Sequence, residues 1–300
     1  QRKSSMAKLN STEQKLLKEI EEWKETGPGF LNSATHVVTK PLLWAAGKLI
    51  PADAQDKLSG VGEKIAEKLQ DASQWTVREE EVLKATKEFE IDSATILELQ
   101  NASVFDLNHV AEEFVTFNTR LAAAEGFGTG LLGWAGLLAD LPALFVLNFR
   151  MLYQISLSFG YKVEPASEEG DEPFEVGYML RIFKIATAAS SEAKEAAIQE
   201  LKEFEDNHPD GIARVGSDFT RKQLGKNAAI NVSRIIINQI VKETLARKAI
   251  TSIPGIGAIL TAGFNYYYVQ DVGRTAIMIY QERFLLDKKG RKKIVTIDVE

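Results

Sequence analysis

The chain has 300 residues, of which 45% are apolar and 26% charged, and its net charge is −6. This composition is that of a folded globular protein, and an acidic chain lacks the basic face that a general nucleic-acid binder needs. The absence of cysteine excludes disulfides, thiolate nucleophiles, zinc fingers and iron–sulfur clusters.

Helical periodicity predicts an all-α protein. The first helix begins near Ser11, where Ser11 and Gln14 have the spacing of a capping box, and Gly27-Pro28-Gly29 ends it. The first 30 residues contain no apolar h-region, so we expect no secretory signal. The further ranges with helical spacing are 33–50, 53–74, 76–90, 92–100, 104–124, 173–205 (one or two helices) and 218–248. Only Ile294–Val299 has the pattern of a short terminal β-strand.

Two apolar segments are long enough to span a bilayer, which takes about 20 residues. Gly126–Phe149 contains a single charge, Asp140, and Ala249–Gln270 contains none. Each segment also contains a capping residue, a spacer and a proline, as in Asp140-Leu141-Pro142 and Ser252-Ile253-Pro254. Because proline is tolerated in the first turn of a helix, we expect a new helix to begin at Asp140 and neither segment to span.

Small residues follow a helical spacing in both segments. The spacing of four, three and three residues between Gly126, Gly130, Gly133 and Gly136 is expected to place these glycines on one face of a helix. A second helix backbone can approach such a face closely. The predicted core is therefore a multi-helix bundle around two central glycine-rich apolar helices. Insertion into a membrane or enclosure of an acyl chain is the alternative. The residues assigned to this packing are Gly126, Gly130, Gly133, Gly136, Pro142, Pro254, Gly255 and Gly257.

Six polar residues stand inside the apolar helices and are the candidate site residues. They are Asp140, Asn148, Arg150, Asn265, Asp271 and Arg274. One interpretation is a buried ionic lock, with Asp140 or Arg150 paired to Asp271 or Arg274, because buried charges are usually paired. The other is a polar pocket in apolar surroundings, where a carboxylate acts as a base on a small molecule.

Motifs for a reaction are weak or missing. Gly128–Gly133 fits G-x-G-x-x-G, but predicted helices lie on both sides, whereas a dinucleotide site needs a preceding strand. The three histidines, His36, His109 and His208, are scattered, and no P-loop or G-x-S-x-G occurs. We therefore predict no catalytic residue, no metal site and no cofactor.

The C-terminal part carries features suited to a membrane surface. Tyr266-Tyr267-Tyr268 pack at the edge of the core or, together with Trp134 and Phe145, form an interfacial aromatic belt. A run of five cations in six positions is either a solvated tail or a docking site for anionic lipid. The five cations are Lys288, Lys289, Arg291, Lys292 and Lys293.

The paired motifs resemble the EcsC family over roughly residues 40–286. The first motif runs from Glu125-Gly126 through Thr129-Gly130, Gly133 and Gly136 to Asp140–Leu144, followed by Arg150, Gln154 and Gly160-Tyr161. The second runs from Ile253 to Ala258, followed by Asn265, Asp271 and a helix that ends near Arg283.

The resemblance implies a bacterial helical protein that is cytoplasmic or peripheral on the inner face of the membrane. The family takes its name from a gene that neighbours an ABC transporter in some bacteria, which implies a membrane-protein partner, but it supplies no reaction. Many members carry a Glu-Arg pair after the loop, whereas here Val176 follows Glu175.

We expect an N-terminal helix in residues 1–30, one helical domain in 31–287 and a basic tail in 288–300. The predicted function is a non-enzymatic binding or scaffold protein that associates with lipid, a membrane surface or a membrane protein. The alternative is a hydrolase or transferase that acts on an apolar substrate beside Asp140 or Asp271. The sequence does not define an oligomeric state.

Overall fold

The computed structural model describes residues 8–26, 52–70, 76–129, 133–163, 173–208, 234–245 and 257–290, in which all regular structure is helical. The all-α prediction is therefore confirmed for this part of the chain. The expected 33–50 helix and the 294–299 strand lie outside it. The helices are α1 (Ser11–Glu25), α3 (Ala52–Gln70), α4 (Glu79–Glu88), the 3₁₀ helix η2 (Leu97–Asn101), α5 (Val104–Thr129), α6 (Gly133–Ser158), α7 (Phe174–Thr187), α8 (Ser191–Asn207), α11 (Gly257–Gly290) and residues 234–245.

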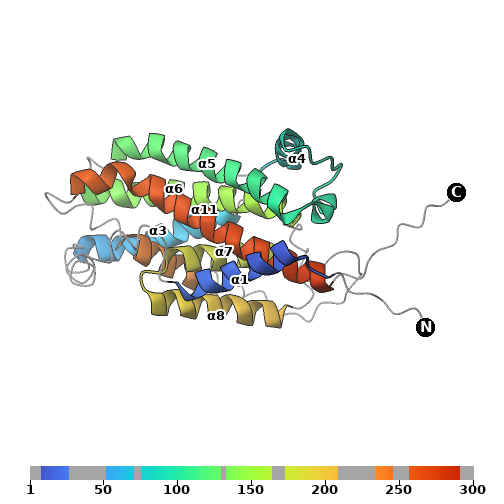
Figure 1. Cartoon of the computed structure of the whole chain (residues 1–300). Coiled ribbons are helices and arrows are strands. Elements are labelled where there is room, and N and C mark those ends of the chain that lie inside the picture. The colour runs from blue at the N-terminus through green and yellow to red at the C-terminus, as the bar shows by residue number, and fades with distance from the viewer. Residues whose placement is uncertain are drawn as a thin grey trace.

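The long helix α11 is the centre of the bundle. It packs against α5, α6 and α7, and α1 lies over its C-terminal half (Figure 1). From Phe264 to Leu285 only Tyr266, Tyr267 and Arg274 are exposed. A helix that is buried on nearly every side is surrounded by other elements, so α11 occupies the centre of the bundle.

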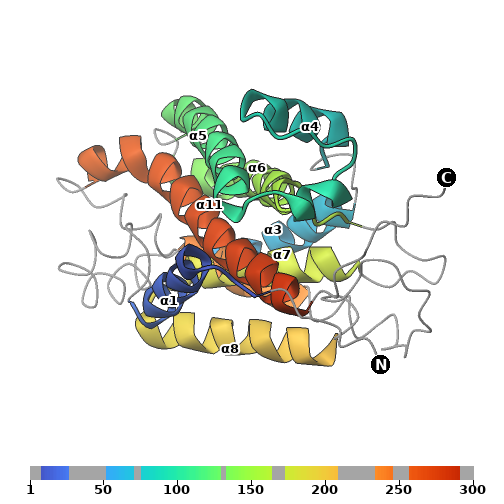
Figure 2. The ribbon, with the colours of Figure 1, turned by 45° about the vertical axis from the view of Figure 1, so that its right-hand side comes forward.

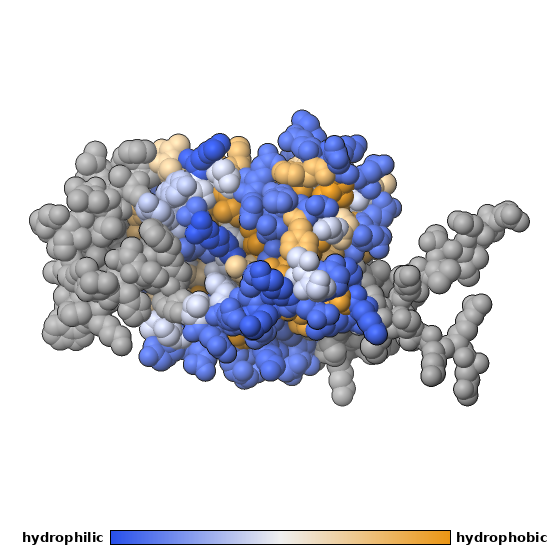
Figure 3. All heavy atoms as spheres, viewed as in Figure 1, coloured by the Kyte–Doolittle hydropathy of each residue, from blue (hydrophilic) through white to orange (hydrophobic). Residues whose placement is uncertain are grey.

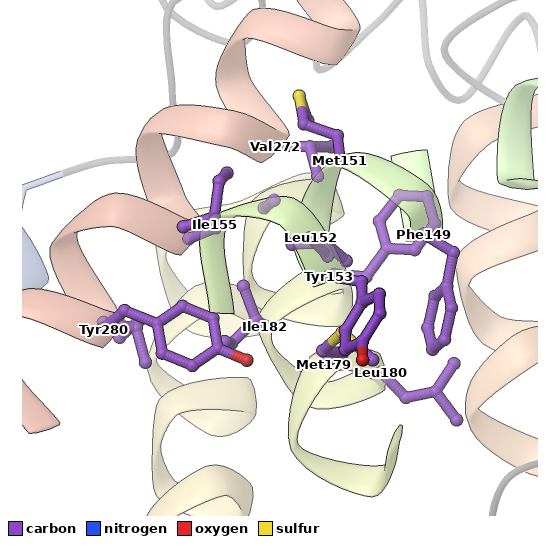
Figure 4. Packing of buried hydrophobic residues seen from close by; sticks show 14 of the residues in the cluster. Phe149, Met151, Leu152, Tyr153, Ile155, Met179, Leu180, Ile182, Val272 and Tyr280 are labelled. Atoms are coloured by element: carbon purple, nitrogen blue, oxygen red, sulfur yellow. The ribbon is translucent and has the colours of Figure 1, made fainter. Parts of the chain in front are cut away.

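The core lies where α6, α7 and α11 meet. Every residue from Met151 to Tyr161 is buried, as is every residue from Glu175 to Phe183. Figure 4 shows side chains of these three helices filling the space between them, including Leu152, Ile182 and Val272. Burying each such side chain contributes roughly 1.5–3 kcal/mol, so this contact supplies much of the driving force for folding.

Helices α5 and α11 run antiparallel and approach closely. The amide of Gln281 donates to Asn108 Oδ1 at 2.8 Å near the start of α5. Further along, a Cβ atom added at Gly273 would lie 2.5 Å from Cγ2 of Val115. This is a close backbone approach of the kind expected from the sequence, but at a glycine that the spacing pattern did not select.

Helix α6 begins at Gly133 and contains Pro142 in its interior. The prediction that Asp140 begins a new helix is therefore wrong. An interior proline costs about 3 kcal/mol because it removes a hydrogen bond and its ring crowds the preceding turn. Leu138, Leu141 and Phe145 are buried on both sides of it. Their burial offsets that cost, so the helix continues through the proline.

The four spaced glycines do not lie on one helix. Gly126 belongs to α5, whereas Gly133 and Gly136 belong to α6. Gly130 lies outside the described residues, as do Pro254 and Gly255. Gly257 is the first residue of α11, but its surroundings, like those of the other three glycines in helices, are not described. Close packing at these positions stays a prediction.

The apolar residues whose spacing predicts the 104–124 helix, among them Val110, Phe117 and Leu121, form a stripe on α5 that is only half buried. Val110 is fully buried, but Phe117 is 61% exposed and Leu121 is 38% exposed. Helix α4 packs against the N-terminal part of α5, where the ring of Phe89 stacks on His109. The periodicity therefore identified the stripe correctly, but it could not show which part of the stripe other helices cover.

Helix α1 is capped at both ends by polar contacts. Asn10, rather than the predicted Ser11, is the N-cap, and it forms a capping box with Glu13. At the other end, the ammonium group of Lys194 from α8 donates to the carbonyl oxygens of Trp23 (2.6 Å) and Thr26 (3.1 Å). It also lies 4.1 Å from the centre of the Trp23 ring. A cation here offsets the negative end of the helix dipole.

We expect the stability of the protein to rise between pH 7 and pH 9. Burial lowers the pKa of Lys194 from 10.5 to about 8. Between these values the unfolded chain binds more protons than the folded one, so the free energy of unfolding increases with pH, by about 1 kcal/mol from pH 7 to pH 9. Denaturant titrations across this range should show that Lys194→Met removes the increase. Lys202→Met, at an exposed position of α8, should retain it. A variant Lys194→Met with the parental slope would contradict this assignment.

Candidate functional site

A buried ion pair joins α7 to α11. The guanidinium Nη1 of Arg283 donates to Glu175 Oε2 at 2.8 Å, and both side chains are only 4% exposed. Glu175 lies in the first turn of α7 and Arg283 in the last third of α11. The pair therefore fixes the register between two helices that are 108 positions apart in the sequence.

The second oxygen of Glu175 is also satisfied. Oε1 accepts hydrogen bonds from the Tyr280 hydroxyl and from Ser156 Oγ, which lies 3.0 Å away. The Ser156 hydroxyl is also 2.8 Å from the carbonyl oxygen of Tyr161. Burial, reinforced by the negative charge of Glu175, raises the pKa of Tyr280 well above its usual value. The phenol therefore stays protonated and remains a donor.

Aromatic rings surround the guanidinium group. The Cζ atom of Arg283 lies 3.8 Å from the ring centre of Tyr161, 4.6 Å from that of Tyr178 and 5.3 Å from that of Phe174. Burial opposes the charged form, but the attractions of Glu175 and of the surrounding tyrosines together outweigh it and raise the pKa of Arg283. Cation–π contacts of this kind are strongest where water is excluded. The arginine therefore keeps its charge inside the core.

Two of these tyrosines extend the network outward. The hydroxyl of Tyr161 donates to Asp287 Oδ2 at 2.6 Å, and that of Tyr178 donates to Glu205 Oε1 at 3.0 Å. We call Glu175, Arg283, Ser156 and the tyrosines 161, 178 and 280 the Glu175–Arg283 cluster. It connects α6, α7, α8 and α11 through polar side chains.

The geometry of the Glu175–Arg283 cluster suits fixation of helices better than catalysis. A serine nucleophile needs a base that is free to take its proton. The carboxylate beside Ser156 instead accepts hydrogen bonds on both oxygens and is paired with Arg283. Ser156 also has no exposed surface. Buried pairs of this kind give specificity of packing more reliably than net stability.

The sequence did not select Glu175 or Arg283 as site residues, although each carried a signal. Arg283 belongs to a polar triplet, Gln281-Glu282-Arg283, that separates the apolar runs 276–280 and 284–286. Glu175 is the position at which the family resemblance led us to look for a neighbouring arginine, and Val176 stands there instead. The structure supplies an arginine partner from α11. These signals mark each charge separately, but nothing in the sequence pairs two residues that are 108 positions apart.

Arg150 and Arg274 are not buried as expected. The side chain of Arg150 is 42% exposed, and its Nη2 lies 3.7 Å from Glu81 Oε2 of α4. Arg274 is exposed on α11. The interpretation of these two arginines as parts of a buried lock is therefore wrong, whereas their place in a polar pocket stays a prediction. The aliphatic stems of long cationic side chains can cover apolar surface while the charged ends stay in water, so a position in an apolar helix does not require burial.

Three of the other candidate polar residues are buried in the core, and the fourth has a side chain that the structure does not describe. Asn148 is fully buried, and its amide donates to the carbonyl oxygen of Leu144 at 2.7 Å. Asn265 and Asp271 are buried on α11. The side chain of Asp140 is not among those described. A polar pocket that contains Asp140 or Asp271 stays a prediction.

The aromatic and basic residues near the ends of α11 divide between core and surface. Tyr268 is buried and shares a hydrogen bond of 2.7 Å with Thr244, whereas Tyr266 and Tyr267 are exposed. Phe145 is fully buried, so it cannot belong to an interfacial belt. Helix α11 continues to Gly290, so the expected tail boundary at position 288 lies inside the helix.

Two cations of the basic run have described positions. Lys288 Nζ is 2.5 Å from Glu13 Oε1 of α1, and Lys289 is exposed. Arg291, Lys292 and Lys293 lie outside the described residues. A search for membrane-spanning helices among the described residues found none of sufficient length and hydrophobicity.

Comparisons with known proteins agree with the resemblance. Two curated relatives come from Bacillus subtilis (strain 168). The uncharacterised protein YdbA is 21% identical over 280 residues, which cover 91% of this chain and 92% of YdbA. The protein EcsC is 24% identical over 233 residues, which cover 77% of this chain and 85% of that protein. No solved structure matches the chain. The model of the EcsC protein family matches residues 14–285, and the chain therefore belongs to this family.

Proposed function

We propose that this protein is a non-enzymatic binding protein that associates with the surface of an anionic membrane through α11. The observation that carries the proposal is a line of exposed residues along this helix: Tyr267, Arg274 and Lys289. At about 100° per residue they fall within an arc of about 60°, and they extend over about 33 Å of helix axis. Leu285 and Asp271 lie on the same arc but are buried, so these residues offer contact points toward the two ends of α11 rather than a continuous face.

The residue types on this line suit a lipid headgroup region. Tyrosine is enriched at membrane interfaces because its ring is apolar and its hydroxyl polar. The line ends in the basic run, of which Arg291, Lys292 and Lys293 follow Lys289 in the sequence. Each cation near an anionic surface contributes about 1 kcal/mol, and the attraction is strongest at low salt.

Exposed apolar side chains support contact at the other end of the line. Phe117 and Leu121 are one turn apart on α5, whose C-terminal half lies beside the N-terminal half of α11. The same end of the bundle carries Tyr267. Figure 3 shows that the face with α11 is mostly hydrophilic, with separate small hydrophobic patches. Such a face favours a reversible association at the surface.

Co-sedimentation with vesicles tests the electrostatic part. We expect the parent to bind vesicles with anionic lipid at low salt and to release them at high salt. A variant in which Lys289, Arg291, Lys292 and Lys293 become glutamine should bind at least about tenfold more weakly, because four cations near the surface are lost. Parental binding that is equal on neutral and anionic vesicles would overturn the proposal.

A matched control variant distinguishes the effect of the position of these four cations from the effect of the total charge of the protein. Glutamine at Lys15, Lys18, Lys84 and Lys87, all exposed on α1 or α4, removes the same charge from other faces. This variant should bind nearly as well as the parent. Serine at both Phe117 and Leu121 should weaken binding without changing its dependence on salt, because it removes apolar contact only. Equal losses in the two glutamine variants would show that net charge, and not the α11 surface, determines binding.

A further inference from the structure

Helix α1 is attached to the bundle by ion pairs together with a narrow apolar contact. Ile20 is its only fully buried apolar side chain, whereas Leu16, Leu17 and Trp23 are partly buried. Figure 2 shows α1 lying between α8 and α11. Lys24 pairs with Glu282 of α11. By contrast, every residue of α7 from Glu175 to Phe183 is buried. The position of α1 therefore depends on charged contacts more than that of the core helices does.

Glu13 has two roles in this attachment. Its Oε2 accepts from the backbone N–H of Asn10 at 3.0 Å and completes the capping box of α1. Its Oε1 accepts from Lys288 Nζ at 2.5 Å, although the Glu13 side chain is only 4% exposed. The first cation of the basic run is thus the counter-charge of a buried carboxylate on α1.

We propose that α1 is a clasp that anionic lipid opens, because lipid headgroups and Glu13 compete for Lys288. This inference rests on the proposed membrane function. When a headgroup takes Lys288, the buried Glu13 carboxylate loses its counter-charge, and a buried unpaired charge is costly. Release of α1 returns Glu13 to water and removes that cost. Membrane binding and α1 docking therefore oppose each other, and the coupling acts equally in both directions.

Distance measurement between two spin labels tests the movement. The chain has no cysteine, so Lys18→Cys on α1 and Gln199→Cys on α8 give two unique labelling positions, both exposed. We expect one short distance in solution and with neutral vesicles, because α1 packs on α8. Anionic vesicles should shift the distance to longer and broader values. An unchanged distance in protein that has bound to anionic vesicles would overturn the clasp while leaving the proposed membrane function intact.

The variant Glu13→Gln tests the competition directly. Glutamine is accepted in a capping box, so α1 keeps its helical start and loses only the charge. Glu13→Gln should bind anionic vesicles about fivefold more tightly than Glu19→Gln, because Lys288 no longer has to leave a buried carboxylate. Its label distance should stay short on these vesicles, because no unpaired buried charge then drives α1 out. Glu19→Gln makes the same change in net charge at an exposed position of α1.

Equal affinities of the two glutamine variants would overturn the clasp. Failure of the parent to sediment with anionic vesicles at low salt would instead overturn the proposed function, and the clasp with it. The two failures differ because sedimentation reports binding, whereas the labels report the position of α1.

Discussion

Replacement of Arg283 by methionine is expected to lower the free energy of unfolding by about 3–5 kcal/mol. Methionine fills much of the space among the three aromatic rings but leaves Glu175 as an uncompensated buried charge. The Tyr280 and Ser156 hydroxyls still donate to Glu175, but neutral donors cannot replace a charged partner. Denaturant titrations followed by circular dichroism measure the loss.

A double-mutant cycle separates the ion pair from general damage to the core. Glu175→Gln retains an oxygen that can accept from Tyr280, and the double variant with Arg283→Met buries no unpaired charge. We expect the double variant to lose clearly less stability than the sum of the two single losses. The exposed pair of Lys15 and Glu19 serves as the control, because its loss should cost under about 1 kcal/mol. Additive losses at positions 175 and 283 would contradict the pairing.

Replacement of Gly273 by leucine is expected to cost about 3 kcal/mol or to displace α5 from α11. Even a Cβ atom at this position would lie 2.5 Å from Val115 Cγ2 and 2.7 Å from its Cγ1. Overpacking of this kind typically costs 1–3 kcal/mol, and the surrounding core of α6 and α7 leaves α11 little room to move away. Thermal and denaturant unfolding check the loss.

Two further variants make the test specific. Val115→Ala removes both Cγ atoms, so it should restore part of the stability that Gly273→Ala loses. Gly60→Ala, on α3, meets no atom within 4 Å and should stabilise the protein by about 0.5–1 kcal/mol, because alanine favours a helix more than glycine does. If Gly273→Ala behaves like Gly60→Ala, the close approach of α5 and α11 is wrong.

Local patterns predicted the helices, because helical periodicity depends on neighbours three and four positions away. They failed where distant residues decide the outcome. Phe117 and Leu121 belong to the apolar stripe of α5, but they are exposed, because the elements that cover a stripe are distant in the sequence. Pro142 has the sequence environment of a helix start, yet the burial of Leu138 and Phe145 keeps α6 continuous through it.

The Glu175–Arg283 cluster was inaccessible to sequence reasoning for a related physical reason. A buried ion pair has no fixed spacing, and 108 residues separate its two members. The expectation of an ionic lock on α11 was sound as chemistry, since buried charges need partners. The choice of Arg150 and Arg274 was wrong because both positions turn out to face the surface.

The central position of α11 has a consequence for the order of events during synthesis. A ribosome adds about 5–20 residues per second, so roughly 5 to 20 s pass between the appearance of Glu175 and that of Arg283. During this interval α5, α6 and α7 exist without the helix that covers their inner faces. The nascent chain must therefore carry exposed apolar surface until α11 leaves the exit tunnel, and chaperones that bind such surface have their opportunity in that period.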